Sequence, residues 1–101
     1  MTNEKLIEVA QLYRKLFKGE PIRGPVEKDW TLWTDEEQHN HLLHVCDGVI
    51  GFVRDNRIDK AFRWLGWLQG VLVASSVFTI EQTSLHNMPN PDPDGGEPAD
   101  G

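Results

Sequence analysis

The architecture of this chain depends on residues 57–80, which read RIDKAFRWLGWLQGVLVASSVFTI. Apolar side chains recur every three or four positions from Ile58 to Leu72, which is the period of an α-helix. The last 17 residues of this stretch carry no charge, and Gln69 is their only large polar side chain. A helix that is apolar on most sides has to be covered on most sides. The stretch therefore predicts a central core helix, a protein interface or a membrane span.

The membrane alternative treats residues 64–80 as a single span. These 17 residues lie at the short end of the range of about 17–25 that crosses a bilayer. Basic side chains flank only the N-terminal side, which fits an N-in orientation. Against a span, Gln69 lies near the middle, and Ser75 and Ser76 add further polar groups. Because two other amphipathic helices are available as cover, we expect protein rather than lipid around this segment and no membrane partner.

A first helix is predicted near the N-terminus. Apolar residues from Leu6 to Phe17 form a helical stripe, and the opposite face carries acidic residues early and lysines late, as the helix dipole favours. Gly19 followed by Pro21 is typical of the end of a helix. We therefore expect this helix to extend almost to Gly19.

Two capping signals mark further helix starts. Thr34 and Glu37 have the spacing of a capping box, in which each residue bonds to the backbone of the other. They predict a second helix over about 35–54. The same spacing recurs at residues 79–82 and predicts a short last helix over 80–87.

The second and third helices are joined by a short turn at Asp55-Asn56, and Asn56 is expected to cap the third helix. A connection this short makes the two helices antiparallel neighbours. No long stretch alternates with a period of two. The predicted fold class is therefore all-α: a small three-helix bundle built on this antiparallel hairpin, with a short C-terminal helix.

Residues 88–101, MPNPDPDGGEPADG, differ from the rest of the 101-residue chain. They are rich in proline, glycine and acidic residues, and they carry four of the six net negative charges. Such a composition cannot bury enough apolar surface to offset its ordering entropy. We expect one helical domain over 1–87 and a disordered acidic tail over 88–101. The net charge of -6 also argues against nucleic acid as a partner, because binding phosphates needs a basic face.

Small residues repeat within the second and third helices. Gly66, Gly70 and Ala74 lie on one line of the third helix, and Gly48 and Gly51 lie on one side of the second. Glycine inside a helix costs about 1 kcal/mol relative to alanine, so a compensating gain is expected. Close approach of two backbones supplies one. The hypothesis is tight packing between these two helices, and the alternative is packing across a homodimer.

Four tryptophans are the most distinctive part of the composition. Trp30 and Trp33 lie in the connector after the first helix, and Trp64 and Trp67 lie on the third helix near Val71. Tryptophan is enriched at interaction hot spots because it buries a large area with few rotatable bonds. These five residues are the candidate interface, either with a second copy or with a partner protein. The alternative is that the tryptophans only fill the gap between the connector and the third helix.

The chain offers little for catalysis. His39, His41 and His44 crowd the start of the second helix, and His41 and His44 share a face as metal ligands can, but no further ligand completes a tetrahedral set. They are weak metal candidates, and a metal-binding protein is one alternative function. Cys46 lies on the apolar stripe and is expected to be buried and inert. No phosphate-binding loop or hydrolase motif is present, so we predict no enzyme and no cofactor.

The stretch KAFRWLGWLQGVLVA (60–74), followed by FTIE (78–81) and His86-Asn87, resembles small helical proteins of tailed bacteriophages and prophages. Those proteins have an RWLGxxQG-type helix followed by a short helix that ends in His-Asn. The resemblance covers roughly residues 58–87. Ser75-Ser76 and the Pro/Asp-rich tail depart from the pattern. The resemblance implies a phage accessory protein that inhibits a host or defence factor or aids replication or packaging, and it transfers no functional residue.

These observations lead to one functional hypothesis. The N-terminal residues lack the basic-then-apolar layout of a signal peptide, so the cytoplasm of a bacterial host is the expected compartment. We expect a small interaction protein that acts by surface complementarity, as a homodimer and on a protein partner. Its alternatives are the membrane-associated phage protein and the metal-binding protein described above.

Overall fold

The computed structural model describes residues 1–89. The helices are α1 (Asn3–Arg14), the short 3-10 turn η1 (Trp30–Leu32), α2 (Asp35–Arg54), α3 (Ile58–Ala74) and α4 (Ile80–Asn87). No strand occurs within this range, which confirms the all-α prediction. The predicted tail starts at 88, and its residues 90–101 lie outside the described part of the chain.

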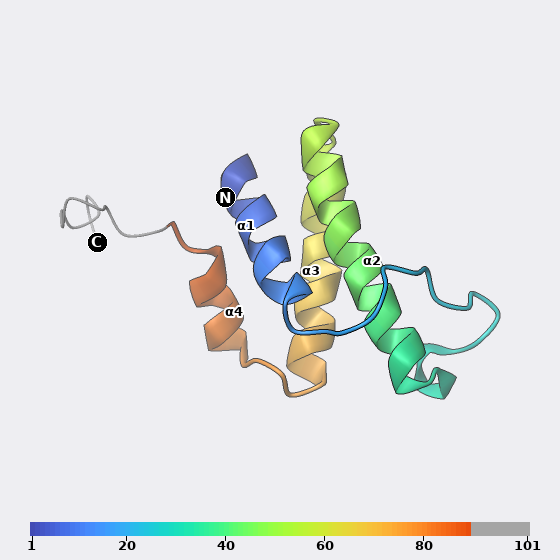
Figure 1. The fold of residues 1–101 in the computed structure, drawn as a ribbon. Helices are drawn as coiled ribbons and strands as arrows, with labels where there is room; N and C mark the ends of the chain where they lie inside the picture. Colours follow the sequence, from blue (N-terminus) through green and yellow to red (C-terminus); the bar gives the residue numbers. More distant parts are fainter. Residues whose placement is uncertain (90–101) are drawn as a thin grey trace.

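The bundle is built on the hairpin of α2 and α3. These two helices run antiparallel side by side, and α1 packs against both of them (Figure 1). The core between the three helices consists of apolar side chains from all of them. Its fully buried members are Leu6, Val9, Ala10, Tyr13, Cys46, Val49, Ala61, Leu65, Leu68 and Leu72. Most members of the predicted stripes thus form the core, whereas Leu16 and Phe62 are exposed.

Both predicted capping boxes are present. The Thr34 side chain accepts a hydrogen bond from the Glu37 backbone N–H at 3.1 Å, and the Thr34 backbone N–H donates to Glu37 Oε1 at 3.0 Å. At the start of α4, Thr79 and Gln82 make the same reciprocal pair at 3.1 and 2.9 Å. Each box satisfies backbone donors that the first turn of a helix leaves without intrahelical partners. The starts of α2 and α4 were therefore predicted correctly.

α1 is shorter than its apolar stripe predicts. It ends at Arg14, and the following N–H groups of Lys15 and Leu16 bond three residues back rather than four. The apolar spacing continues to Phe17 because Phe17 also packs on the core. Phe17, however, lies in the connector after α1 and not in the helix. Leu16 is 42% exposed and does not belong to the buried face.

The turn between α2 and α3 also differs from the expectation. Asn56 does not cap α3; its φ is 59°, in the left-handed region, and Arg57 holds the N-cap position without a side-chain hydrogen bond. Asparagine tolerates this region better than most residues, which explains its place at the turn. Ser76, with φ 62°, adopts the same left-handed conformation in the turn after α3.

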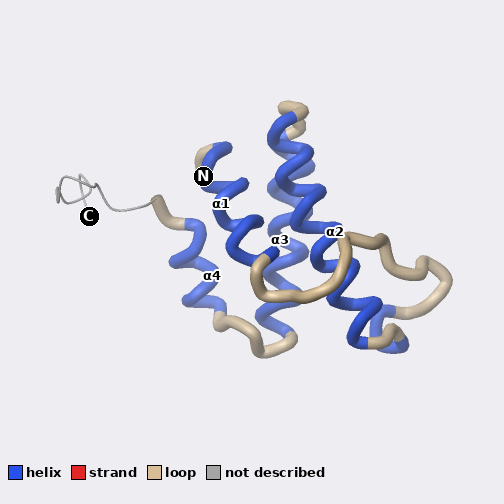
Figure 2. The backbone as a smooth tube through the Cα atoms, viewed as in Figure 1, coloured by secondary structure: helices blue, strands red, loops and turns tan. Residues whose placement is uncertain are grey.

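Residues 64–80 do not form one continuous helix. α3 ends at Ala74, and a loop separates it from α4, as Figure 2 shows. None of the helices in residues 1–89 is long and apolar enough to cross a membrane.

Candidate binding site at the aromatic cluster

The four tryptophans meet on one side of the α2–α3 hairpin. Trp30 lies 5.0 Å from Trp33 and 5.8 Å from Trp67 between ring centroids. Trp64 packs edge-on against Phe52 at 4.8 Å. Residues of the connector (residues 15–34) are thereby brought onto the surface of α3.

Histidines complete this arrangement. The His41 ring lies 5.2 Å from Trp33, 5.6 Å from Trp67 and 6.3 Å from Trp30, so it sits among three of the tryptophans. His44 lies 5.7 Å from His41 and 6.0 Å from Trp64. It therefore joins Trp64 to the other rings. We call these seven residues the aromatic cluster: Trp30, Trp33, His41, His44, Phe52, Trp64 and Trp67.

Hydrogen bonds hold the connector in place on α2. The Gly24 backbone N–H donates to His41 Nδ1 at 3.1 Å, and Gln38 Nε2 donates to the Trp30 carbonyl at 3.1 Å. Within the connector itself, the Trp33 indole N–H donates to the Lys28 carbonyl at 2.9 Å. Gly24 also lies so close to the Trp33 ring that a Cβ there would collide with it. Only glycine fits this contact, which gives a physical reason for its place in the connector.

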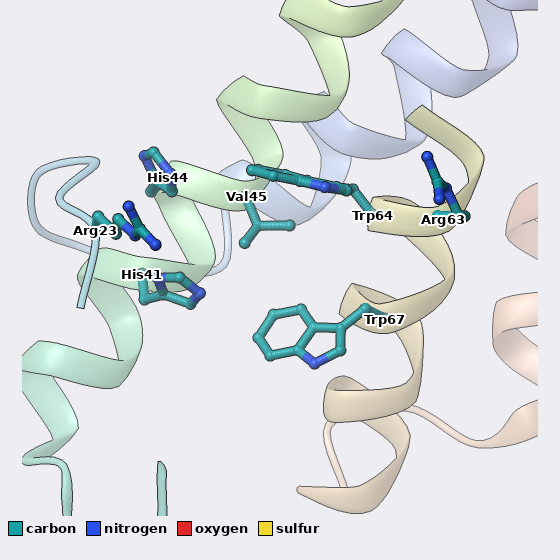
Figure 3. A pocket seen from close by; sticks show the side chains of 7 residues that line it. All are labelled: Arg23, His41, His44, Val45, Arg63, Trp64 and Trp67. Atoms are coloured by element: carbon teal, nitrogen blue, oxygen red, sulfur yellow. The ribbon is translucent and has the colours of Figure 1, made fainter. Parts of the chain in front are cut away.

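A pocket of about 570 Å³ opens beside the cluster, between α2 and α3. Its lining residues are Arg23, His41, His44, Val45, Arg63, Trp64 and Trp67. Figure 3 shows the two histidines on the α2 side and the two tryptophans on the α3 side, with Arg23 and Arg63 at opposite edges. We call it the α2/α3 pocket. Its volume is within the range of about 300–1,000 Å³ that is typical of ligand sites.

The electrostatic character of the pocket is positive. Arg23 and Arg63 are both exposed, and none of the seven lining residues is acidic. Burial lowers the pKa of His41 below its usual value, and the neighbouring His44 and Arg23 lower it further. Both effects favour the neutral imidazole, which suits the role of His41 as acceptor for the Gly24 N–H. The two arginines supply the permanent charge.

The three histidines proposed as metal candidates do not form one set. The His39 ring packs against Phe17 at 5.2 Å, away from the contact between His41 and His44. Within residues 1–89, no three His, Cys, Asp or Glu side chains are placed to hold a metal ion together.

The glycines divide into two groups. A Cβ on Gly48 would lie 2.5 Å from the Trp64 ring, so Gly48 lets α3 pack closely against α2. Gly51, Gly66 and Gly70 have open space where a Cβ would be, and Gly66, Gly70 and Ala74 are exposed. The hypothesis of tight packing within the chain is therefore wrong for these three glycines. Packing of the exposed stripe of Gly66, Gly70 and Ala74 on a second copy stays a prediction.

Two other sequence candidates lie partly or fully in the core. Val71 is half-buried and packs against the core, so it presents only part of its side chain to a partner. Cys46 is completely buried, and this burial raises the pKa of its thiol to about 12. A thiol in this state is a poor nucleophile at neutral pH.

Sequence reasoning missed the contribution of Arg23, Arg63 and Phe52 to this region. Arg23 lies in a connector without periodicity, and nothing in the local pattern places it beside α2. The helical spacing of Phe52 and Arg63 does not reveal that Phe52 contacts Trp64 or that Arg63 borders the pocket.

Comparison with protein families, with characterised proteins and with solved structures gives no significant match. The interpretation of the aromatic cluster and of the α2/α3 pocket accordingly depends on their geometry and charge.

Proposed function

We propose that this chain is an accessory protein of phage type that acts by binding a partner protein through the aromatic cluster and the α2/α3 pocket. On this proposal it performs no chemistry of its own and works in the cytoplasm of a bacterial host. The partner is a host or defence protein, which the binding inhibits. The resemblance of residues 58–87 to phage proteins supports the biological setting, and the pocket supports the mode of action.

The observation that carries this proposal is the state of Trp67. Its side chain is held against Trp30 and His41, yet the residue is 44% exposed. A large aromatic ring that is fixed in position but still accessible loses little conformational entropy when a partner covers it. Such rings are typical of the energetic centre of protein interfaces.

Charge defines the kind of partner that fits. Arg23 and Arg63 border the pocket from opposite edges, and the tryptophans form an apolar wall between them. Arginine binds carboxylates in a bidentate manner, and its fixed donors favour this over a single point contact. The pocket thus suits a partner segment in which an acidic side chain neighbours an apolar or aromatic one.

A second candidate function has its own support. The volume of about 570 Å³ is that of a small-molecule pocket, and indole rings beside arginines also suit a small anion that carries a flat ring. In this alternative the chain sequesters such a molecule instead of a protein.

The test compares two aspartate variants on the same helix. Trp67→Asp changes the exposed ring of the pocket, whereas Phe62→Asp changes a ring that is 40% exposed but does not line it. Tagged wild-type chain and both variants are used to capture proteins from a bacterial lysate, and the captured protein is then purified and titrated. We expect wild type and Phe62→Asp to bind it, and Trp67→Asp to lose binding at least about tenfold, as an interface hot spot does.

A complementary titration separates the two candidate functions. Tryptophan fluorescence is followed while a mononucleotide, an aromatic carboxylate or an acidic peptide is added. Saturable binding of the small molecules, abolished by Arg23→Ala with Arg63→Ala, would favour the small-anion alternative. Equal binding by Trp67→Asp and wild type in both experiments would contradict the proposed site altogether.

A further inference from the structure

The helix α4 is held to the bundle by a network of polar side chains. Gln69 Nε2 of α3 donates to the Tyr13 hydroxyl at 2.9 Å and to Asn87 Oδ1 at 2.7 Å. Asn87 Nδ2 donates back to Gln69 Oε1 at 3.1 Å. The Tyr13 hydroxyl oxygen lies 2.8 Å from His86 Nδ1. Four side chains from α1, α3 and α4 are thus joined into one chain of hydrogen bonds.

The direction of the last hydrogen bond depends on the tautomer of His86. Tyr13 accepts from Gln69, so its own O–H is available to donate to His86 Nδ1. This direction, in which Tyr13 both accepts and donates, holds when His86 is neutral with Nδ1 unprotonated. The pairs Tyr13–His86 and Phe78–His86 also make edge-on ring contacts, at 5.4 and 4.7 Å between centroids.

Little else fastens α4. Thr83 is its only buried residue, and the apolar side chains Ile80 and Leu85 are exposed. Docking of α4 therefore depends largely on the polar network and on the ring contacts of His86. The aromatic cluster does not include any of these residues.

We infer that α4 is a releasable helix, and that protonation of His86 switches it from docked on α1 and α3 to detached. A protonated imidazole no longer accepts from the Tyr13 O–H, and that buried O–H has no other acceptor in the network. Detachment returns His86 to water and uncovers Tyr13, Phe78 and Gln69. The rest of the bundle keeps its core, because the core residues belong to α1, α2 and α3.

The surroundings of His86 support release of α4 at low pH rather than at high pH. Burial lowers the pKa of His86, and Lys5 lowers it further. Lys5 is paired with Glu8 at 3.6 Å. On α1, Tyr13 contacts His86 directly, and Lys5, Glu8 and Lys15 line one surface hollow together with His86. Glu4 lines a second hollow with Asn87. Helix α3 contributes the uncharged Gln69, and the only other titratable residue of α4 is Glu81 at its start.

The pH window follows from the lowered pKa. The detached helix binds a proton more readily than the docked one, so docking is favoured above the usual histidine pKa of about 6.5 and weakens as the pH falls below it. The docking equilibrium changes tenfold for each unit by which the docked pKa lies below the free one.

The test is amide hydrogen exchange of the full chain between about pH 8 and about pH 5, corrected for intrinsic rates. Amides of α4 are compared with those in the second half of α2. An NMR titration of the His86 ring in the same protein gives its pKa. We expect α4 protection to fall with pH by the factor that this pKa predicts, while α2 protection stays nearly constant. Unchanged α4 protection, or a His86 pKa at or above the free value, would overturn the switch.

Two variants isolate the histidine. His86→Asn places an amide oxygen near the position of Nδ1, so it keeps an acceptor for Tyr13 but cannot be protonated; α4 protection should then be independent of pH. Tyr13→Phe removes the donor and should lower α4 protection at pH 8. A pH response in His86→Asn equal to that of wild type would also overturn the proposal. Should His86→Asn leave α4 detached at every pH, the wild-type titration and exchange decide.

Discussion

The Gly24 backbone N–H donates a hydrogen bond to Nδ1 of His41 at 3.1 Å, and this bond joins the connector to α2 beside the candidate pocket. Because Nδ1 has to be unprotonated, the bond exists only in the neutral state of His41. Burial, with His44 and Arg23 nearby, holds the pKa of His41 below its usual value. The folded connector and the neutral imidazole therefore stabilise each other.

We predict that acid loosens the connector. The lowered pKa of His41 means that the folded state takes up a proton less readily than the unfolded state. The stability contributed by the Gly24–His41 bond is therefore complete above about pH 6.5 and is lost as the pH falls through the lowered pKa. Exchange of the Gly24 amide, followed by NMR, should become faster on acidification. His39→Gln is the control, since the His39 ring contacts Phe17 at the start of the connector and not Gly24. The same acid response in a His41→Gln variant would contradict this explanation.

Replacing Trp67 by aspartate should leave a folded chain. The residue is partly exposed, and its loss removes two aromatic contacts worth about 0.5–1.5 kcal/mol each. Circular dichroism should still show a helical protein with cooperative unfolding at a lower midpoint. Complete unfolding would show that Trp67 belongs to the core, which would also remove the basis for the proposed binding site.

Glycine substitutions should have opposite effects at two positions. Gly70→Ala meets open space and should stabilise the chain by about 1 kcal/mol through helix propensity. Gly48→Ala places a Cβ 2.5 Å from the Trp64 ring and should destabilise it by about 1–3 kcal/mol. Urea denaturation measures both changes.

The Gly70→Ala variant also tests the predicted homodimer. If the exposed stripe of Gly66, Gly70 and Ala74 packs on a second copy, Gly70→Ala should weaken self-association in analytical ultracentrifugation. A wild-type chain that sediments as a monomer at every concentration would remove the homodimer from consideration.

Cys46 should be unreactive in the native protein. With a thiol pKa of about 12 and complete burial, its thiolate fraction at neutral pH is lower than that of a free cysteine by on the order of a thousandfold. A thiol reagent should label the chain only after addition of denaturant. Rapid labelling of native protein would show that the core around Cys46 opens frequently.

The parts of the fold that sequence could predict are those determined by short-range chemistry. Thr34 and Glu37 are three residues apart, so their capping box can be recognised without knowledge of the rest of the chain. The α2–α3 hairpin follows from two apolar stripes and a turn that is too short for any other arrangement.

The parts of the fold and of the candidate site that the sequence could not predict depend on contacts between distant segments. The position of His41 among Trp33 and Trp67 depends on how the connector returns to α2, and the local pattern gave His41 only as a weak metal candidate. The apolar spacing after Arg14 does not distinguish a longer helix from a connector residue, Phe17, that reaches the core. For Gly66 and Gly70, spacing alone does not show whether the partner surface belongs to the same chain.

The turn at residues 55–57 also has a consequence for how the molecule forms. Because only residues 55–57 separate the two long helices, closing this loop costs little chain entropy, and the helices then pack on each other. Contacts of such low sequence separation form early in folding. We expect the α2–α3 hairpin to be the folding nucleus, with α1 docking onto it after the connector has wrapped around.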